Sequence, residues 1–120
     1  MPSVISRSSL DCNQYAATGA RLAVGPLTIG FAAFTLWRNA DAALFAGRVS
    51  MQSDPALWPR DAAKGADLLC AVPHWDWEFR HFPRSEARAL ARHLANHGVG
   101  LIAGHHAHVV QPAERLGKAL

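Results

Sequence analysis

The chain has 120 residues, of which 50% are hydrophobic and 18% are charged, and its formal net charge is +3. This length allows one domain, or part of a larger one, with a real hydrophobic core. The composition excludes a disordered chain, a collagen-like repeat and a disulfide scaffold, and the charge is too small to indicate nucleic acid as a partner.

The first elements along the chain are an irregular lead-in and a β-hairpin. Residues 1–20 show no regular pattern and lack the apolar stretch of a secretory signal. Residues 21–24 and 27–35 are largely apolar and flank Gly25-Pro26, which predicts two strands joined by a turn. Four alternate residues of the second strand are predicted to share one face: Leu27, Ile29, Phe31 and Ala33.

The cellular compartment is inferred from hydrophobicity and cysteine usage. Residues 22–37 are the most hydrophobic stretch, but they fall short of the roughly 20 apolar residues that cross a bilayer. Cys12 and Cys70 lie far apart without CxxC spacing, so we expect two free thiols in a reducing compartment. The apolar neighbours of Cys70 predict that it is buried. The sequence therefore shows no membrane span, and a cytoplasmic location is the default expectation. The alternative is a parent protein whose own N-terminal anchor or signal leads to its export.

The segment after the hairpin is less regular. Residues 42–49 predict up to two helical turns, and residues 51–55 predict a loop. A short helix that starts at Pro55 or Pro59 is expected next, with Gly65 as its stop.

The clearest pattern is a strand, a helix and a second strand. Residues 66–73 are a continuous apolar run, which suits a strand buried on both faces of a parallel sheet. Residues 83–96 have apolar positions at helical spacing, and residues 99–104 form a second short apolar run. Because the carboxyl ends of parallel strands meet at one edge of a sheet, we expect a functional site in the two loops that follow these strands.

Histidines occupy both of these loops. His74 directly follows the first strand, and His105, His106 and His108 follow the second. Imidazole is a common ligand of Zn, Mn and Fe, and an extended His-x-His pair places both rings on one side. The alternative is a solvated turn that happens to be rich in histidine.

The helix between the two strands carries its own charged residues. His93 and His97 have the i, i+4 spacing of a metal chelate, although a histidine near a helix C-terminus is also stabilised by the helix dipole. Arg84, Arg88 and Arg92 form a basic stripe, which indicates a solvated face or, less often, a contact with an acidic substrate.

The first of the two loops alternates aromatic and acidic residues. Trp75, Trp77 and Phe79 either pack at the sheet edge or form walls around a metal site that Asp76 and Glu78 would face. In the second case Glu78 would act as a general acid or base, or would orient a ligand. We expect three residues of the two loops to contact substrate: Trp75, Arg80 and His105.

Two segments together resemble a known family. The sequence His74-Trp-Asp-Trp-Glu-Phe79 is followed by a helix and then by Gly98-Val-Gly-Leu-Ile-Ala-Gly-His-His-Ala-His-Val-Val-Gln-Pro112. This order resembles the CapA family of capsule and poly-γ-glutamate synthesis proteins, whose fold is similar to calcineurin-like metallophosphoesterases. The resemblance covers roughly residues 21–118, and it implies that residues 21–120 form the C-terminal portion of such an α/β domain, of the α+β sandwich type.

The resemblance implies roles for individual residues. His74 matches the histidine of the family's H-W-G motif, and His106 and His108 match its H-P-H motif, so all three are implied ligands of a divalent metal. Glu78 matches the motif glutamate and is the implied catalytic residue. Gln111 matches a further motif position, whose role we leave unassigned.

The chain also departs from the family pattern. Asp76 stands where the family has Gly, which matters if the loop needs a positive φ, and Ala107 stands where Pro is usual. The family's opening motifs (a G-D, an N-x-E and an A-N-N-H) and its closing Y-S-L-G-N-F have no counterpart in the sequence. The resemblance therefore leads us to expect a truncated, incomplete domain.

These observations lead to two functional hypotheses. The first is a CapA-like, hydrolase-like protein of capsule or poly-γ-glutamate biosynthesis, which acts on an anionic polymer or a phosphate-type substrate. The second is a non-catalytic fragment or accessory metal-binding module that needs a partner chain, for example one that supplies the missing N-terminal half. Nucleic-acid binding is the least favoured reading, because no stacking platform accompanies the arginine stripe.

Overall fold

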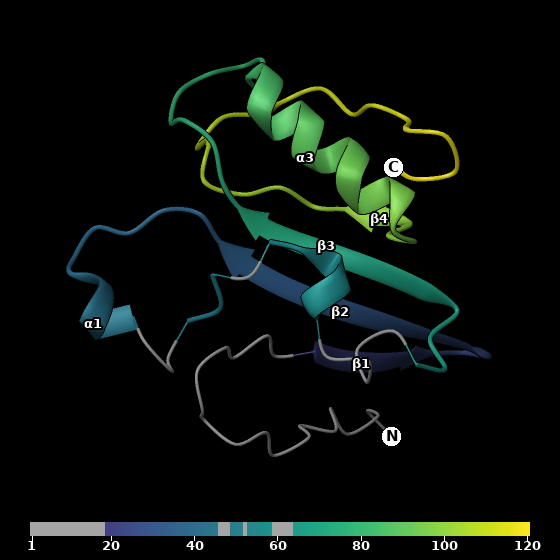
Figure 1. The fold of residues 1–120 in the computed structure, drawn as a ribbon. Helices are drawn as coiled ribbons and strands as arrows, with labels where there is room; N and C mark the ends of the chain where they lie inside the picture. The colour runs from purple at the N-terminus through teal and green to yellow at the C-terminus, as the bar shows by residue number, and fades with distance from the viewer. Residues whose placement is uncertain (1–18, 46–48, 52, 59–63) are drawn as a thin grey trace.

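The fold is mixed α/β and is built on one sheet. The computed structural model describes residues 19–45, 49–51, 53–58 and 64–120. The strands described are β1 (Gly19–Val24), β2 (Leu27–Thr35), β3 (Leu68–His74) and β4 (Leu101–Ile102), in the order β1-β2-β3-β4. β1 is antiparallel to β2, whereas β2, β3 and β4 are mutually parallel. Figure 1 shows β2 and β3 side by side, with α3 (Ser85–Asn96) on the β3–β4 side.

The predicted hairpin is confirmed, with a longer first strand. β1 pairs with β2 from Gly19↔Ala32 to Val24↔Leu27, so the strand begins two residues before the expected start at Arg21. Gly25 has a φ of +57° in the turn, a value that glycine adopts without steric cost. The rest of the expected lead-in, residues 1–18 with Cys12, lies outside the described residues.

The predicted alternation is present in β2, and the more buried face is the one opposite Leu27 and Ala33. The buried side chains are those of Ala32 and Phe34, which are each 4% exposed, while Leu27 and Ala33 are exposed. The small Ala32 lies beside Ala71 of β3, and the ring of Phe34 packs 6.0 Å from that of Trp58. Both faces of this strand carry apolar residues, so periodicity alone did not identify the inner one.

The helices after the hairpin are shorter than expected where they are described. α1 covers Ala42–Phe45, and a 3-10 turn, η1, covers Pro55–Leu57. Asp41 and Asp54 cap these elements, because their carboxylates accept hydrogen bonds from the backbone N–H groups of Ala43 and Ala56. The remainder of the predicted helices falls partly on residues 46–48 and 59–63, outside the described residues.

The strand-helix-strand prediction is confirmed. β3, α3 and β4 follow one another, and β3 and β4 are parallel. Gly98 ends the helix with a φ of +92°. The C-terminal residue Leu120 accepts a hydrogen bond from Ile102 N and donates one to Gly100 O, so the end of the chain runs along β4.

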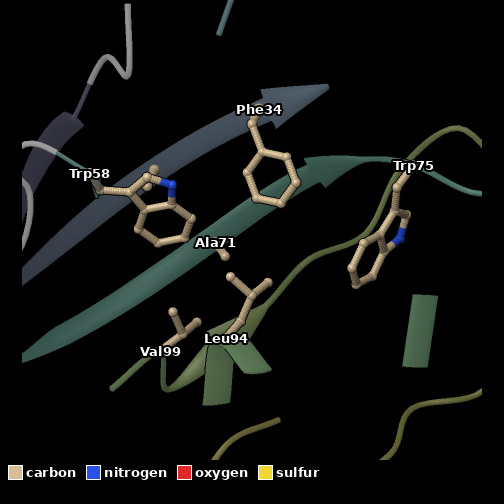
Figure 2. Close-up of a cluster of buried hydrophobic side chains, with 7 residues drawn as sticks. Phe34, Trp58, Ala71, Trp75, Leu94 and Val99 are labelled. Atoms are coloured by element: carbon tan, nitrogen blue, oxygen red, sulfur yellow. The ribbon is translucent and has the colours of Figure 1, made fainter. Parts of the chain in front are cut away.

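The core lies between α3 and the sheet. Leu94 of α3 is fully buried and packs over the strands, as Figure 2 shows. Trp58, the residue that follows η1, is also part of the core. Cys70 is a free, buried thiol, as predicted, and burial raises its pKa. The buried cluster consists of Ala32, Phe34, Trp58, Ala71, Trp75, Leu94 and Val99.

The helices in the described part of the chain are all too short, or too polar, to cross a bilayer.

Candidate functional site

The carboxyl ends of β2, β3 and β4 converge at one edge of the sheet. Thr35, the last residue of β2, is in register with His74, the last residue of β3. His74 in turn forms a parallel bridge with His105, and Trp75 N donates to His105 O at 3.2 Å. The two histidine-bearing loops therefore emerge together, as the sequence predicted.

Four of the predicted site residues meet at this edge. His74 Nε2 lies 3.1 Å from His106 Nδ1. Glu78 Oε1 lies 3.9 Å from His106 Nε2 and 3.7 Å from His108 Nε2. Among the described residues, Glu78, His106 and His108 form a group whose donor atoms could hold a metal ion. We call these four residues, His74 included, the histidine cluster.

The backbone around the cluster adopts left-handed conformations. Asp76, Phe79, His106 and His108 have φ values of 64°, 57°, 95° and 56°, and all four lie in the two loops. Such conformations cost free energy in non-glycine residues and occur mainly where the surroundings enforce them. One enforcing contact joins the loops, because Phe79 N donates to Ala107 O at 2.7 Å. These turns bring Glu78 back over the histidines of the second loop.

Thr35 orients His74, a role that the sequence analysis missed. Its hydroxyl lies 2.9 Å from His74 Nδ1 and accepts a hydrogen bond from Trp37 N at 3.2 Å. In the tautomer in which Nδ1–H donates to Thr35, Nε2 keeps its lone pair and faces His106. The available signal was position, because Thr35 ends a predicted strand next to the strand that carries His74.

The pKa of His74 lies below its ordinary value. Burial is the largest cause, followed by the positive potential of His106, His105 and His108, while Glu78 acts in the opposite direction. The neutral imidazole that these effects favour is the form that binds a metal.

Asp76 does not face the histidine cluster, which corrects the expectation that both acidic residues of its loop would do so. Its carboxylate lies 2.6 Å from Arg84 Nε and accepts a hydrogen bond from Arg84 N at 2.9 Å. Asp76 is 5% exposed, and burial raises its pKa, but the hydrogen bonds from Arg84 outweigh this and hold the pKa below its ordinary value. The carboxylate thus caps α3, whose first flanking residue, Arg84, offers no side-chain cap. Asp76 also adopts the positive φ that the family glycine would allow.

The three expected substrate contacts are absent from the lining of the cavity that the histidine cluster borders. Trp75 is buried in the core, against Gly104. Arg80 lies over the ring of Trp77, with its guanidinium carbon 5.1 Å from the ring centroid. His105 is exposed and lines a different cavity, between α3 and the C-terminal segment. None of these three lines the cavity into which the histidine cluster opens.

That cavity has a volume of about 740 Å³. Part of its lining comes from the segment after β2, which the sequence did not predict to be part of the site. On that side Trp37 lines the cavity, and its ring centroid lies 5.0 Å from that of His106. The described residues that line the cavity are Thr35, Trp37, Arg38, Asn39, Phe45, Val49, His74, Trp77, Glu78, His106 and His108.

The other candidate features of α3 have partners within the protein. His93 and His97 have ring centroids 4.2 Å apart, and His97 Nδ1 lies 2.8 Å from His93 O. Arg88 forms a bidentate ion pair with Glu114. Together with the Asp76–Arg84 pair, this contact occupies two members of the predicted arginine stripe with internal carboxylates.

Comparison with known proteins gives a family match and two similar relatives. The family model "Bacterial capsule synthesis protein PGA_cap" matches residues 15–120. The "PGA biosynthesis protein CapA" of Bacillus subtilis (strain 168) is 39% identical over 78 residues, which are 57% of this chain and 20% of the relative. The "Capsule biosynthesis protein CapA" of Bacillus anthracis is 37% identical over 70 residues, which are 54% of this chain and 17% of the relative. The chain thus spans about a fifth of the length of these relatives, and no solved structure matches it.

Proposed function

Since this chain belongs to the PGA_cap family of bacterial capsule synthesis proteins, we propose that it is a CapA-like protein of capsule or poly-γ-glutamate biosynthesis with a histidine-based metal site. The observation that carries the metal site is the convergence of His74, His106, His108 and Glu78 on one cavity. The substrate we propose is an anionic polymer or a phosphate-type molecule.

The donor set fits a divalent transition metal. The three imidazoles suit Zn, Mn or Fe, and Thr35 provides the outer hydrogen bond that metal-binding histidines commonly have. His106 presents Nδ1 toward His74 and Nε2 toward Glu78, so its ring stands between the other donors. When bound, a divalent ion would supply Lewis-acid polarisation of a substrate oxygen.

The protein residues would orient the substrate and move a proton. Glu78 is exposed to the cavity and lies within 4 Å of two imidazoles. A carboxylate in this position can accept a proton from an attacking water and return it to a leaving group. Trp37 and Trp77 line the same cavity and would offer apolar surface to a bound substrate.

We further propose that the sheet is the C-terminal portion of a calcineurin-like metallophosphoesterase-type domain. The parallel β3-α3-β4 unit with a histidine loop after each strand supports this, as do the family motifs at His74 and His106. Further ligands would come from a segment or partner chain that carries the family's other motifs.

A second candidate function is that of an accessory metal-binding module that a partner chain completes. The favouring observation is that, among the described residues lining the cavity, Glu78 is the single carboxylate. A two-metal site normally needs bridging acidic ligands. Hydrolysis of a phosphodiester by this chain alone would exclude this second function.

Titration of the full chain with Mn²⁺ and Zn²⁺ by calorimetry tests the proposed site. The test variant is His106→Ala/His108→Ala, and the matched control is His93→Ala/His97→Ala, which removes two exposed imidazoles outside the cavity. We expect stoichiometric binding by the wild type and the control, and its loss in the test variant. Binding that survives in the test variant and disappears in the control would place the metal on α3 and overturn the proposal.

A further inference from the structure

Arg38 lines the same cavity as the histidine cluster, and none of the described residues gives it a carboxylate partner. Among the described residues it forms no ion pair, although it belongs to the lining. Arg84 and Arg88 differ in this respect, because Asp76 and Glu114 neutralise them. A guanidinium beside a candidate reaction site, with no ion-pair partner among the described residues, can donate charged hydrogen bonds to a bound oxyanion.

The position of Arg38 relative to the histidine cluster is fixed by the residues just before it. Leu36 N donates to His74 O at 3.0 Å, which extends the β2–β3 pairing by one residue. Thr35 then holds both the backbone of Trp37 and the ring of His74. The Trp37 ring stacks on His106 with an interplanar angle of 31°. Arg38 is therefore tied to two members of the cluster through its own chain neighbours.

The chemistry of the lining favours an oxyanion as the ligand. Next to Arg38, the amide of Asn39 offers additional hydrogen-bond donors. Glu78 is the only carboxylate among the described lining residues, and metal bound beside it would add positive charge to the cavity. Trp37 and Trp77 add apolar surface to the lining of the same cavity.

We propose that Arg38, with Asn39, forms an oxyanion subsite that holds a carboxylate or phosphate group of the substrate next to the histidine cluster. The subsite rests on the proposed function, because it shares the cavity in which that function places the reaction. Arg38 is thus a specificity-determining residue, which selects substrates with a negative charge near the reacting bond. It is not a ligand of the metal.

Binding of two probes to the full chain tests this subsite. The probes are inorganic phosphate and a short poly-γ-glutamate oligomer, each titrated with and without Mn²⁺. The variants are Arg38→Gln, Arg38→Lys and the control Arg92→Gln, whose arginine is exposed on α3 outside the cavity. We expect Arg38→Gln to raise the Kd of the preferred probe by about tenfold or more, since hydrogen bonds to charged groups contribute strongly to binding. Arg38→Lys should have a smaller effect, and Arg92→Gln none.

The outcomes separate the subsite from the metal site. An Arg38-dependent Kd for one probe identifies that probe's chemistry, carboxylate or phosphate, as the ligand. Equal Kd values in wild type and Arg38→Gln, or no binding of either probe to the wild type, would overturn the subsite. Mn²⁺ affinity is measured separately and should not change in Arg38→Gln. If the wild type does not bind Mn²⁺, the proposed function is contradicted. The effect of Arg38→Gln on the Kd of each probe can still be measured in the titrations without metal.

Discussion

The hydroxyl of Thr35 lies 2.9 Å from Nδ1 of His74, and this contact joins the end of one parallel strand to the first histidine of the cluster on the next. Thr35 is only 7% exposed, so water competes little for its hydroxyl group. The same hydroxyl accepts the backbone N–H of Trp37, which stacks on His106. One small side chain therefore positions two sides of the cavity.

Thr35→Val should weaken metal binding without removing any proposed ligand. Valine keeps the shape of threonine but cannot hold the His74 ring in its tautomer, and loss of such an outer partner typically lowers metal affinity by about 10- to 100-fold. Calorimetric titration with Zn²⁺ measures the effect. Thr35→Ser retains the hydroxyl and should restore most of the affinity. Equal Zn²⁺ affinities for Thr35→Val and wild type would remove Thr35 from the site.

Glu78→Gln should abolish proton transfer while leaving the fold intact. Glutamine has nearly the same size, but it cannot accept a proton at neutral pH. For a general base the expected loss is about 10²- to 10⁴-fold in the turnover of a phosphodiester such as bis-p-nitrophenyl phosphate. Glu86→Gln, at an exposed position on α3, is the matched control. Activity that persists in Glu78→Gln at the wild-type level would show that Glu78 is not the base.

Asp76→Asn should destabilise the protein at neutral pH, by about 1–3 kcal/mol for a lost charged hydrogen bond. The pKa of Asp76 is lower in the folded chain than the ordinary aspartate value of 3.8. A lowered carboxyl pKa stabilises the fold above the unfolded pKa, and this contribution is lost as pH falls through the folded pKa. The stability difference between wild type and Asp76→Asn should therefore shrink on acidification below about pH 5.

Denaturant unfolding between pH 2 and pH 7 measures this difference. Glu114→Gln is the control, because the Arg88–Glu114 pair is exposed and its loss should change stability little. The difference in unfolding free energy between wild type and Asp76→Asn could instead stay constant from pH 2 to pH 7. That result would mean that the Asp76–Arg84 pair does not contribute to the loss of stability at acidic pH.

Leu94→Ala should cost about 2–5 kcal/mol of unfolding free energy, as core leucine truncations do. Leu94 has no exposed surface and lies at the centre of the cluster in Figure 2. Leu44→Ala, at a side chain that is 58% exposed, should change stability by less than about 0.5 kcal/mol. Thermal unfolding monitored by circular dichroism compares the two. Similar midpoints for both variants would contradict the packing of α3 on the sheet.

The sequence was sufficient to predict the secondary-structure elements that depend on local hydrophobic pattern and on their order along the chain. Alternation predicted the hairpin, helical spacing predicted α3, and Gly98 predicted its end. Two apolar runs separated by one helix predicted parallel strands, which places the loops of His74 and His106 at the same edge. These inferences hold because each depends on neighbours within a few residues, together with the handedness and geometry common to strand-helix-strand units.

Long-range contacts decided the rest. The left-handed residues set the path of the two loops. This path decides that Asp76 contacts Arg84 and not a metal, and that Trp75 packs in the core and not in the cavity. Thr35 contacts His74, and Arg38 lines the same cavity, because β2 pairs in register with a strand far along the chain. Thr35 and His74 are separated by 39 positions. The hydrophobic pattern of β2 does not predict that pairing, because a strand with apolar residues on both faces fits several registers equally well. The sequence by itself thus determined which edge carries the site, and only the tertiary structure decided which side chains face one another there.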